Sequence, residues 1–139
     1  LERLRPVGLA ELGLRQALAA LLRLWGESHP GVVVEAAISP DLDETGETVD
    51  LTIYRVIQEA LTNVFRHANA THVNVSVEPA ALRGTFGSSR VRVSDDGCGL
   101  RADHKLGLGL TGMRERILAL GGSLDVVSGG GGVTVEALI

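Results

Sequence analysis

Residues 54–70, YRVIQEALTNVFRHANA, constrain the fold more than any other part of the chain, because they combine an apolar face with a row of polar side chains. Glu59, Asn63 and His67 follow one another at intervals of four residues. On a helix of about 3.6 residues per turn these three fall within an arc of about 80°. The neighbouring arc is apolar: Ile53, Ile57, Ala60, Leu61, Val64 and Ala68. The polar row either marks the solvated border of an amphipathic helix or lines a cavity.

Two glycine-rich motifs follow this helix and favour the cavity. Asp95-Asp96-Gly97-Cys98-Gly99, with the spacing D-x-G-x-G, comes after the strand-like residues 90–94. The motif G-x-G-L at residues 107–110 comes next, before another amphipathic helix. The order of the three motifs carries more information than any one of them.

In this order the motifs resemble the N box and the glycine boxes of the Bergerat-type ATP-binding domain. That domain is shared by gyrase-type topoisomerases, certain chaperones, mismatch-repair proteins and sensor histidine kinases. The chain is most similar to histidine kinases of the nitrate-sensor type. Residues 54–68 match their Y-R-[IV]-[IV]-Q-E-A-L-x-N-x-x-[KR]-H-A segment, and residues 109–116 match their G-L-x-G-M-[RK]-E-R segment. The resemblance extends over residues 4–139.

Composition agrees with one compact domain. The chain has 139 residues, and 45% of them are hydrophobic, which is enough for a core. With a formal charge of −4 and arginines scattered along the sequence, we expect no nucleic-acid surface. No apolar run approaches the eighteen or so residues of a membrane span, so we expect no membrane contact by these residues.

Hydrophobic periodicity predicts an α+β fold. Helical patterns cover residues 9–25, 49–68 and 113–120, and strand patterns cover residues 32–38, 72–77, 90–94, 123–127 and 133–139. The last strands are hairpin-linked, so the pattern is not a regular βαβ winding. We expect a two-layer sandwich: a mixed, mostly antiparallel sheet covered on one face by helices, as the resemblance also implies.

The resemblance implies a role for each residue of the polar row. The residue that matches Asn63 contacts a metal ion, here Mg²⁺, through its amide oxygen. Glu59 is the matching acid, which orients or deprotonates the group that attacks the γ-phosphate of ATP. His67 matches a position near the phosphates, although a structural histidine at a helix end is an alternative.

The D-x-G-x-G motif is expected to bind adenine. The exocyclic amine of adenine is a hydrogen-bond donor, so an acceptor-only carboxylate at Asp95 would prefer adenine over guanine. The resemblance assigns this role to the same residue. Gly97 and Gly99 would let the backbone approach the base closely, and Asp96 is predicted to be a turn residue.

The second glycine box is expected to bind phosphates at the entrance of the helix predicted from Met113. Unpaired N–H groups and the helix dipole make such an entrance an anion site. Its residues are Gly107, Gly109, Leu110 and Gly112, and residues 100–106 would form a short lid. Near the last strand, Thr134 either supplies a hydroxyl near the adenine or points to the outer face.

The domain organisation follows from the resemblance and from the histidines. Residues 6–139 are expected to be the ATP-binding catalytic domain, and residues 1–5 the end of a preceding dimerisation helix. The four histidines are followed by proline, alanine, valine and lysine, whereas a phosphoacceptor histidine is typically followed by an acid. We therefore expect the phosphoacceptor histidine to lie on a dimerisation domain outside these residues.

The function implied is that of a sensor histidine kinase domain. It would bind ATP and Mg²⁺ and present the γ-phosphate to that histidine, for later relay to a response regulator. We expect a cytoplasmic domain, whose parent protein is either free or anchored in the cell membrane. Two alternatives stay open: an anti-sigma factor of the serine-kinase type, and an interaction module that no longer binds nucleotide.

Overall fold

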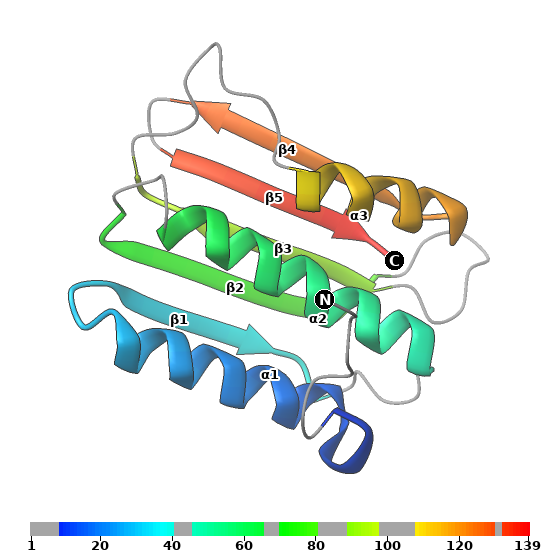
Figure 1. The fold of residues 1–139 in the computed structure, drawn as a ribbon, viewed down its shortest axis with the longest axis horizontal. Coiled ribbons are helices and arrows are strands. Elements are labelled where there is room, and N and C mark those ends of the chain that lie inside the picture. The colour runs from blue at the N-terminus through cyan, green and yellow to red at the C-terminus, as the bar shows by residue number, and fades with distance from the viewer. Residues whose placement is uncertain (1–8, 41–45, 66–69, 81–88, 98–107, 130–131) are drawn as a thin grey trace.

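The computed structural model describes residues 9–40, 46–65, 70–80, 89–97, 108–129 and 132–139 (Figure 1). Within these ranges the chain forms three helices and five strands. The helices are α1 (Leu9–Ser28), α2 (Glu47–Asn63) and α3 (Leu108–Ala119). The strands are β1 (Val33–Ile38), β2 (His72–Pro79), β3 (Ser89–Asp95), β4 (Ser123–Gly129) and β5 (Gly132–Leu138).

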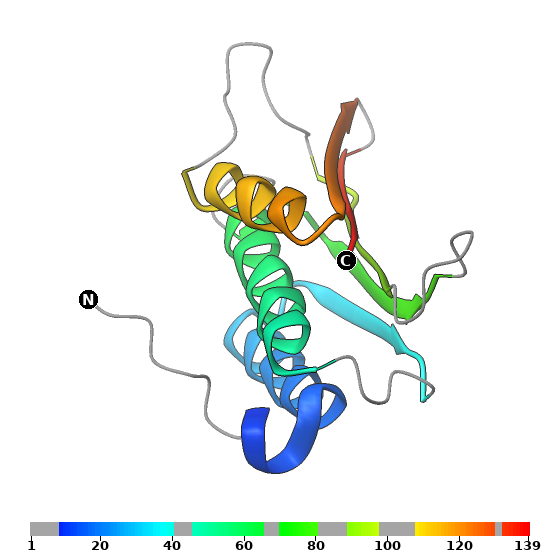
Figure 2. The ribbon, with the colours of Figure 1, turned by 90° about the vertical axis from the view of Figure 1, so that its right-hand side faces the viewer.

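The five strands form one mixed sheet in the order β1-β2-β3-β5-β4. β1 pairs with β2 in parallel, and the other three pairings are antiparallel. All three helices lie on the same face of this sheet, and the other face carries none of them (Figure 2). The predicted α+β two-layer sandwich is therefore confirmed.

Alternation along the strands decides which side chains face the helices. On β3 the buried residues Val91, Val93 and Asp95 alternate with the more exposed Arg92 and Ser94. Residues of a strand point to opposite faces in turn. The valines therefore face the helices, and Asp95 follows them onto the same face at the end of the strand.

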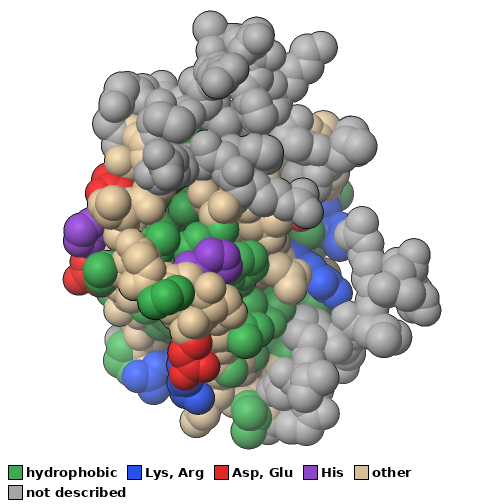
Figure 3. Space-filling model, turned by 60° about the vertical axis from the view of Figure 1, so that its left-hand side comes forward, with side chains coloured by type: hydrophobic (Ala, Val, Ile, Leu, Met, Phe, Trp, Pro, Cys, Tyr) green, Lys and Arg blue, Asp and Glu red, His purple; other side chains and the backbone are tan. Residues whose placement is uncertain are grey.

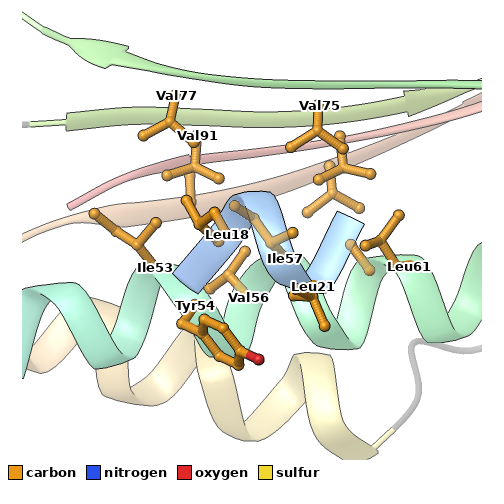
Figure 4. Close-up of a cluster of buried hydrophobic side chains, with 14 of the residues drawn as sticks. Leu18, Leu21, Ile53, Tyr54, Val56, Ile57, Leu61, Val75, Val77 and Val91 are labelled. Atoms are coloured by element: carbon orange, nitrogen blue, oxygen red, sulfur yellow. The ribbon is translucent and has the colours of Figure 1, made fainter. Parts of the chain in front are cut away.

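The core lies between α2 and the middle of the sheet. Ile53, Ile57 and Leu61 of α2 have no measurable exposure, and Figure 4 shows the first two pointing toward the valines of the central strands. Burying one such side chain stabilises the fold by about 1.5 to 3 kcal/mol. α1 and α3 flank α2, and both contact it. The central helix is therefore fixed on three sides.

Three element boundaries differ from those predicted. α3 begins at Leu108 rather than Met113, so Gly109 and Gly112 lie inside the helix. α2 ends at Asn63, and residues 64 and 65 continue it as a wider π-type turn. α1 extends to Ser28 and contains a break at Gly13, whose φ of 85° is a left-handed conformation that suits glycine. Among the described helices, none combines the length and hydrophobicity that a bilayer span requires.

Gly122 allows the chain to leave α3 in close contact with the end of β5. Its N–H donates to the carbonyl of Ile117, which closes the end of the helix. A Cβ built on Gly122 would overlap the carbonyl oxygen of Leu138 and lie 2.9 Å from Cγ2 of Ile117. A side chain at this position would force the helix and the strand apart.

We therefore expect Gly122→Ala to lower the free energy of unfolding by about 1 to 3 kcal/mol, the usual cost of overpacking. Urea denaturation followed by circular dichroism would measure it. Gly26→Ala is the matched control, because a Cβ there meets nothing within 4 Å and alanine favours helix. Equal effects of the two substitutions would contradict this account of Gly122.

Candidate functional site

The topology brings the chemically interesting residues to one end of the sheet. β3 ends at Asp95, which pairs with Val73 at the start of β2. β5 begins beside it at Gly132. Only residues 64–71 separate Asn63, the last residue of α2, from β2, so α2 ends at this end of the molecule as well (at the left of Figure 1). We call it the Asp95 end.

Asp95 presents a buried carboxylate at this end. Only 7% of the residue is exposed, although a charged group is seldom buried without partners. Its Oδ1 accepts a hydrogen bond of 2.8 Å from the N–H of Gly97, which closes a tight turn. A carboxylate has about four acceptor sites. Among the contacts of the described residues the turn occupies one of these sites, which leaves acceptor capacity for a donor supplied by a ligand.

Gly132 is a site residue that the sequence analysis missed. A Cβ built on it would overlap the carbonyl oxygen of Asp95 and lie 3.1 Å from Oδ1 of the same residue. Its φ of 123° is also one that other residues rarely adopt. Glycine at this position is therefore what lets β5 close against the Asp95 carboxylate. Its place at the end of a glycine run, directly before a strand, was the available signal.

Asp96 does more than the predicted turn residue would do. Its Oδ1 accepts hydrogen bonds of 2.8 Å from the N–H groups of Thr71 and His72, and its Oδ2 accepts one of 2.6 Å from the Thr71 hydroxyl. The imidazole of His72 lies 3.3 Å from Oδ2. These contacts, that of the Thr71 hydroxyl first, hold the pKa of Asp96 far below its ordinary value. Asp96 thus fastens the end of β3 to the start of β2.

Glu59 and Asn63 lie one turn apart on α2, and both are partly buried. Partial burial is what the border of an amphipathic helix predicts, and it leaves both side chains accessible to a ligand. An amide oxygen is a ligand that suits Mg²⁺, which usually takes only one or two protein ligands and completes its shell with phosphates and water. Asn63 therefore fits a metal ion held mainly by nucleotide. In the described ranges, no cluster of three or more His, Cys, Asp or Glu side chains could hold a metal ion by itself.

The second glycine box has a different geometry from the one predicted. Gly109, Leu110 and Gly112 lie within α3 rather than ahead of it. The first four N–H groups of a helix lack partners within it, so the anion site expected at this helix belongs to residues 108–111. The N–H of Gly112 falls just outside that set.

Thr134 is not brought to Asp95. Its hydroxyl lies 3.0 Å from the hydroxyl of Ser94, its partner in the β3–β5 pairing. Both side chains point to the face of the sheet that carries no helix, whereas Asp95 points to the helical face. The alternative that Thr134 points outward is the one observed. His67, Gly99 and Gly107, together with the predicted lid at residues 100–106, lie outside the described residues.

Residues 48–139 match the family described as "Histidine kinase-, DNA gyrase B-, and HSP90-like ATPase". The chain belongs to this family. The match spans α2, Asp95 and the whole of the sheet except β1, so the ATP-binding resemblance is confirmed and covers the Asp95 end.

Individual relatives are sensor histidine kinases. The chain is 40% identical to the signal transduction histidine-protein kinase/phosphatase UhpB of Salmonella typhimurium, over 91% of this chain and 24% of that protein. It is 34% identical to the sensor histidine kinase LiaS of Bacillus subtilis, over 98% of this chain and 36% of that protein. The chain therefore spans about a quarter to a third of the length of these relatives.

The fold is also found among solved structures. The histidine kinase domain of the blue-light activated kinase EL346 from Erythrobacter litoralis superimposes with a TM-score of 0.68 at 25% identity. The match covers 91% of this chain and 60% of that one. Similarity to the nitrate-sensor type in particular stays a prediction.

The Asp96 contacts predict an acid-dependent contribution to stability. Because the pKa of Asp96 is lower in the folded chain than its ordinary value of 3.8, the contribution is fully present above that value. It declines as the pH falls below 3.8 toward the pKa of the folded state. Asp96→Ala should therefore lower the melting temperature at neutral pH, and the difference from the unmutated chain should shrink as the solution is made acidic.

Melting curves of both proteins, followed by circular dichroism at neutral pH and at several acidic values, would test this. A difference that stays constant across the acidic range would contradict the assignment. Asp125→Ala is a suitable control, because this aspartate on β4 is exposed.

Proposed function

We propose that this chain is the ATP- and Mg²⁺-binding catalytic domain of a sensor histidine kinase. It presents the γ-phosphate of ATP to a histidine on a dimerisation domain outside these residues. The observation that carries the proposal is the buried carboxylate of Asp95, set at the end of β3 with Asn63 at the same end of the molecule. Both residues lie in the part of the chain that matches the ATPase family.

Asp95 recognises the adenine base in this proposal. The amino group of adenine donates to the free acceptor sites of the carboxylate, whereas guanine has an acceptor oxygen at the corresponding position. Two acceptors facing each other in a buried site repel, so the same contact rejects guanine. Gly97 and Gly99 allow the base to approach the backbone, and Gly132 keeps the carboxylate in place by leaving room for it.

The triphosphate extends from the base toward α2 and α3. The N–H groups at the start of α3, those of Gly109 and Leu110 among them, donate to phosphate oxygens. Asn63 supplies a ligand for Mg²⁺, which neutralises part of the phosphate charge when it is bound. His67, which lies outside the described residues, remains the proposed neighbour of the phosphates.

Glu59 acts on the incoming nucleophile. It lies one turn before Asn63 on the same side of α2, so a group that approaches the γ-phosphate from the partner domain would meet this carboxylate. Glu59 would orient the attacking imidazole or accept its proton. The phosphorylated histidine then serves as the donor to a response regulator.

The remaining parts of the proposal concern the parent protein. Residues 1–5, which lie outside the described ranges, are the proposed end of the preceding dimerisation helix. ATP is an intracellular substrate, so we place this domain in the cytoplasm, whether or not its parent is anchored in the membrane. Thr134 is not included in the proposed site, because its hydroxyl contacts Ser94 on the opposite face.

Calorimetric titration with ATP and GTP tests adenine recognition. The unmutated chain should bind ATP and should prefer it clearly over GTP. Asp95→Asn replaces one acceptor by a donor and should weaken ATP binding by about 1 to 3 kcal/mol. Gly132→Ala should weaken it as well, because the added Cβ displaces Asp95, while Gly31→Ala, where a Cβ meets nothing within 4 Å, should not. Equal binding of ATP and GTP by the unmutated chain would exclude adenine recognition by Asp95.

The same titration with and without Mg²⁺ tests the role of Asn63. We expect Mg²⁺ to strengthen ATP binding to the unmutated chain. Asn63→Ala should remove about 1 to 3 kcal/mol of the binding free energy in Mg²⁺ and much less in EDTA, because only the metal contact is lost. A variant that keeps the full effect of Mg²⁺ would show that Asn63 is not a metal ligand.

A further inference from the structure

Three aromatic rings meet at the Asp95 end, where α1 and α2 both finish. Trp25 and His29 come from the end of α1 and the turn after it, and Phe65 comes from the π-type turn after α2. Trp25 and Phe65 are nearly parallel, at 4° with ring centroids 4.8 Å apart, and the rings of His29 and Phe65 are 4.1 Å apart. We call these residues the aromatic stack. Figure 3 turns this side of the molecule forward.

The α1 side of the stack is held firmly. The backbone N–H of His29 lies 3.1 Å from the carbonyl oxygen of Trp25, and so does its ring Nδ1. A carbonyl oxygen can only accept, so Nδ1 must carry a proton and donate. The imidazole is therefore tied to the last turn of α1, and its ring lies 5.3 Å from that of Trp25. α1 thus presents two fixed rings to Phe65.

The α2 side of the stack is the less regular one. The N–H of Val64 reaches the carbonyls of both Ala60 and Leu61, and the helix then widens into its π-type turn. Wider turns of this kind are rare, and they often occur beside functional sites. Asn63 is the residue just before the widening. The geometry of its backbone therefore depends on what holds Phe65.

Phe65 cannot act on the ligand directly. Two residues correspond to roughly half a turn both in an α-helix and in a wider π-type turn, so Phe65 and Asn63 point to nearly opposite sides of α2. The ring of Phe65 faces α1, and the amide of Asn63 is left for the ligand side. Any influence of the stack on nucleotide must pass through the backbone of this one turn.

We propose that Trp25 and His29 are positioning residues for Asn63. By stacking on Phe65 they hold the last turn of α2 in the geometry that lets the Asn63 amide reach the metal-bound nucleotide. The inference rests on the proposed Mg²⁺–ATP site, and it adds two residues of α1 to it. The middle of α2 does not need this support, because Ile53, Ile57 and Leu61 already anchor it in the core.

The test is the effect of Mg²⁺ on ATP affinity in Trp25→Ala, measured by calorimetry in Mg²⁺ and in EDTA. Loss of the ring should weaken Mg²⁺–ATP binding about three- to tenfold and metal-free ATP binding less than about twofold, as for a substitution that changes coupling between sites. Trp25→Phe keeps an aromatic ring and should restore most of the effect of Mg²⁺. Leu14→Ala, a buried residue near the other end of α1, controls for loss of stability alone.

The outcomes separate this inference from the proposed function. If Mg²⁺ does not strengthen ATP binding to the unmutated chain, the proposed metal site is wrong, and the positioning role falls with it. If Mg²⁺ does so, and acts equally on Trp25→Ala and Leu14→Ala, only the positioning role is overturned. Should circular dichroism show that Trp25→Ala is unfolded, Phe65→Leu keeps an apolar side chain at the same contact and carries the same expectation.

Discussion

The packing of α2 onto the central strands is the interaction on which the rest of the structure depends. The helix has α1 and α3 on its two sides and the sheet beneath it, so its apolar face can take only one rotation. That rotation also fixes where Glu59 and Asn63 stand. The same contacts therefore set the core and the candidate site. A rotation of α2 about its axis would expose its apolar face and would also move Glu59 and Asn63 out of place.

Strand alternation gives two adjacent carboxylates different tasks. Asp95 continues the buried face of β3, and one of its oxygens accepts a hydrogen bond from the N–H of Gly97 in the turn that follows the strand. Asp96 is exposed, and its carboxylate oxygens accept hydrogen bonds from Thr71 and His72 at the start of β2. Asp96 therefore holds in place the turn in which Asp95 accepts a hydrogen bond from the N–H of Gly97.

Much of this could be predicted from sequence, because the patterns involved are local. The apolar arc of α2 and the alternating valines identified the layers, and two long motif matches identified the family.

The features that the sequence did not predict depend on residues that are distant in sequence. The partners of Asp96 lie about 25 residues before it, and the neighbour of Gly132 is on another strand. The outward direction of Thr134 follows from its pairing with Ser94, which the sequence does not reveal. The start of α3 was missed because glycines are poor helix formers.

The position of the only tryptophan has a practical consequence. Trp25 does not sit in the main core but at the joint between the ends of α1 and α2, with its ring against Phe65. Intrinsic fluorescence of this protein is thus a local signal from that joint, while circular dichroism averages over the helices. Where the fluorescence changes before the circular dichroism during denaturation, the chain has opened at the Asp95 end before its helices have unfolded.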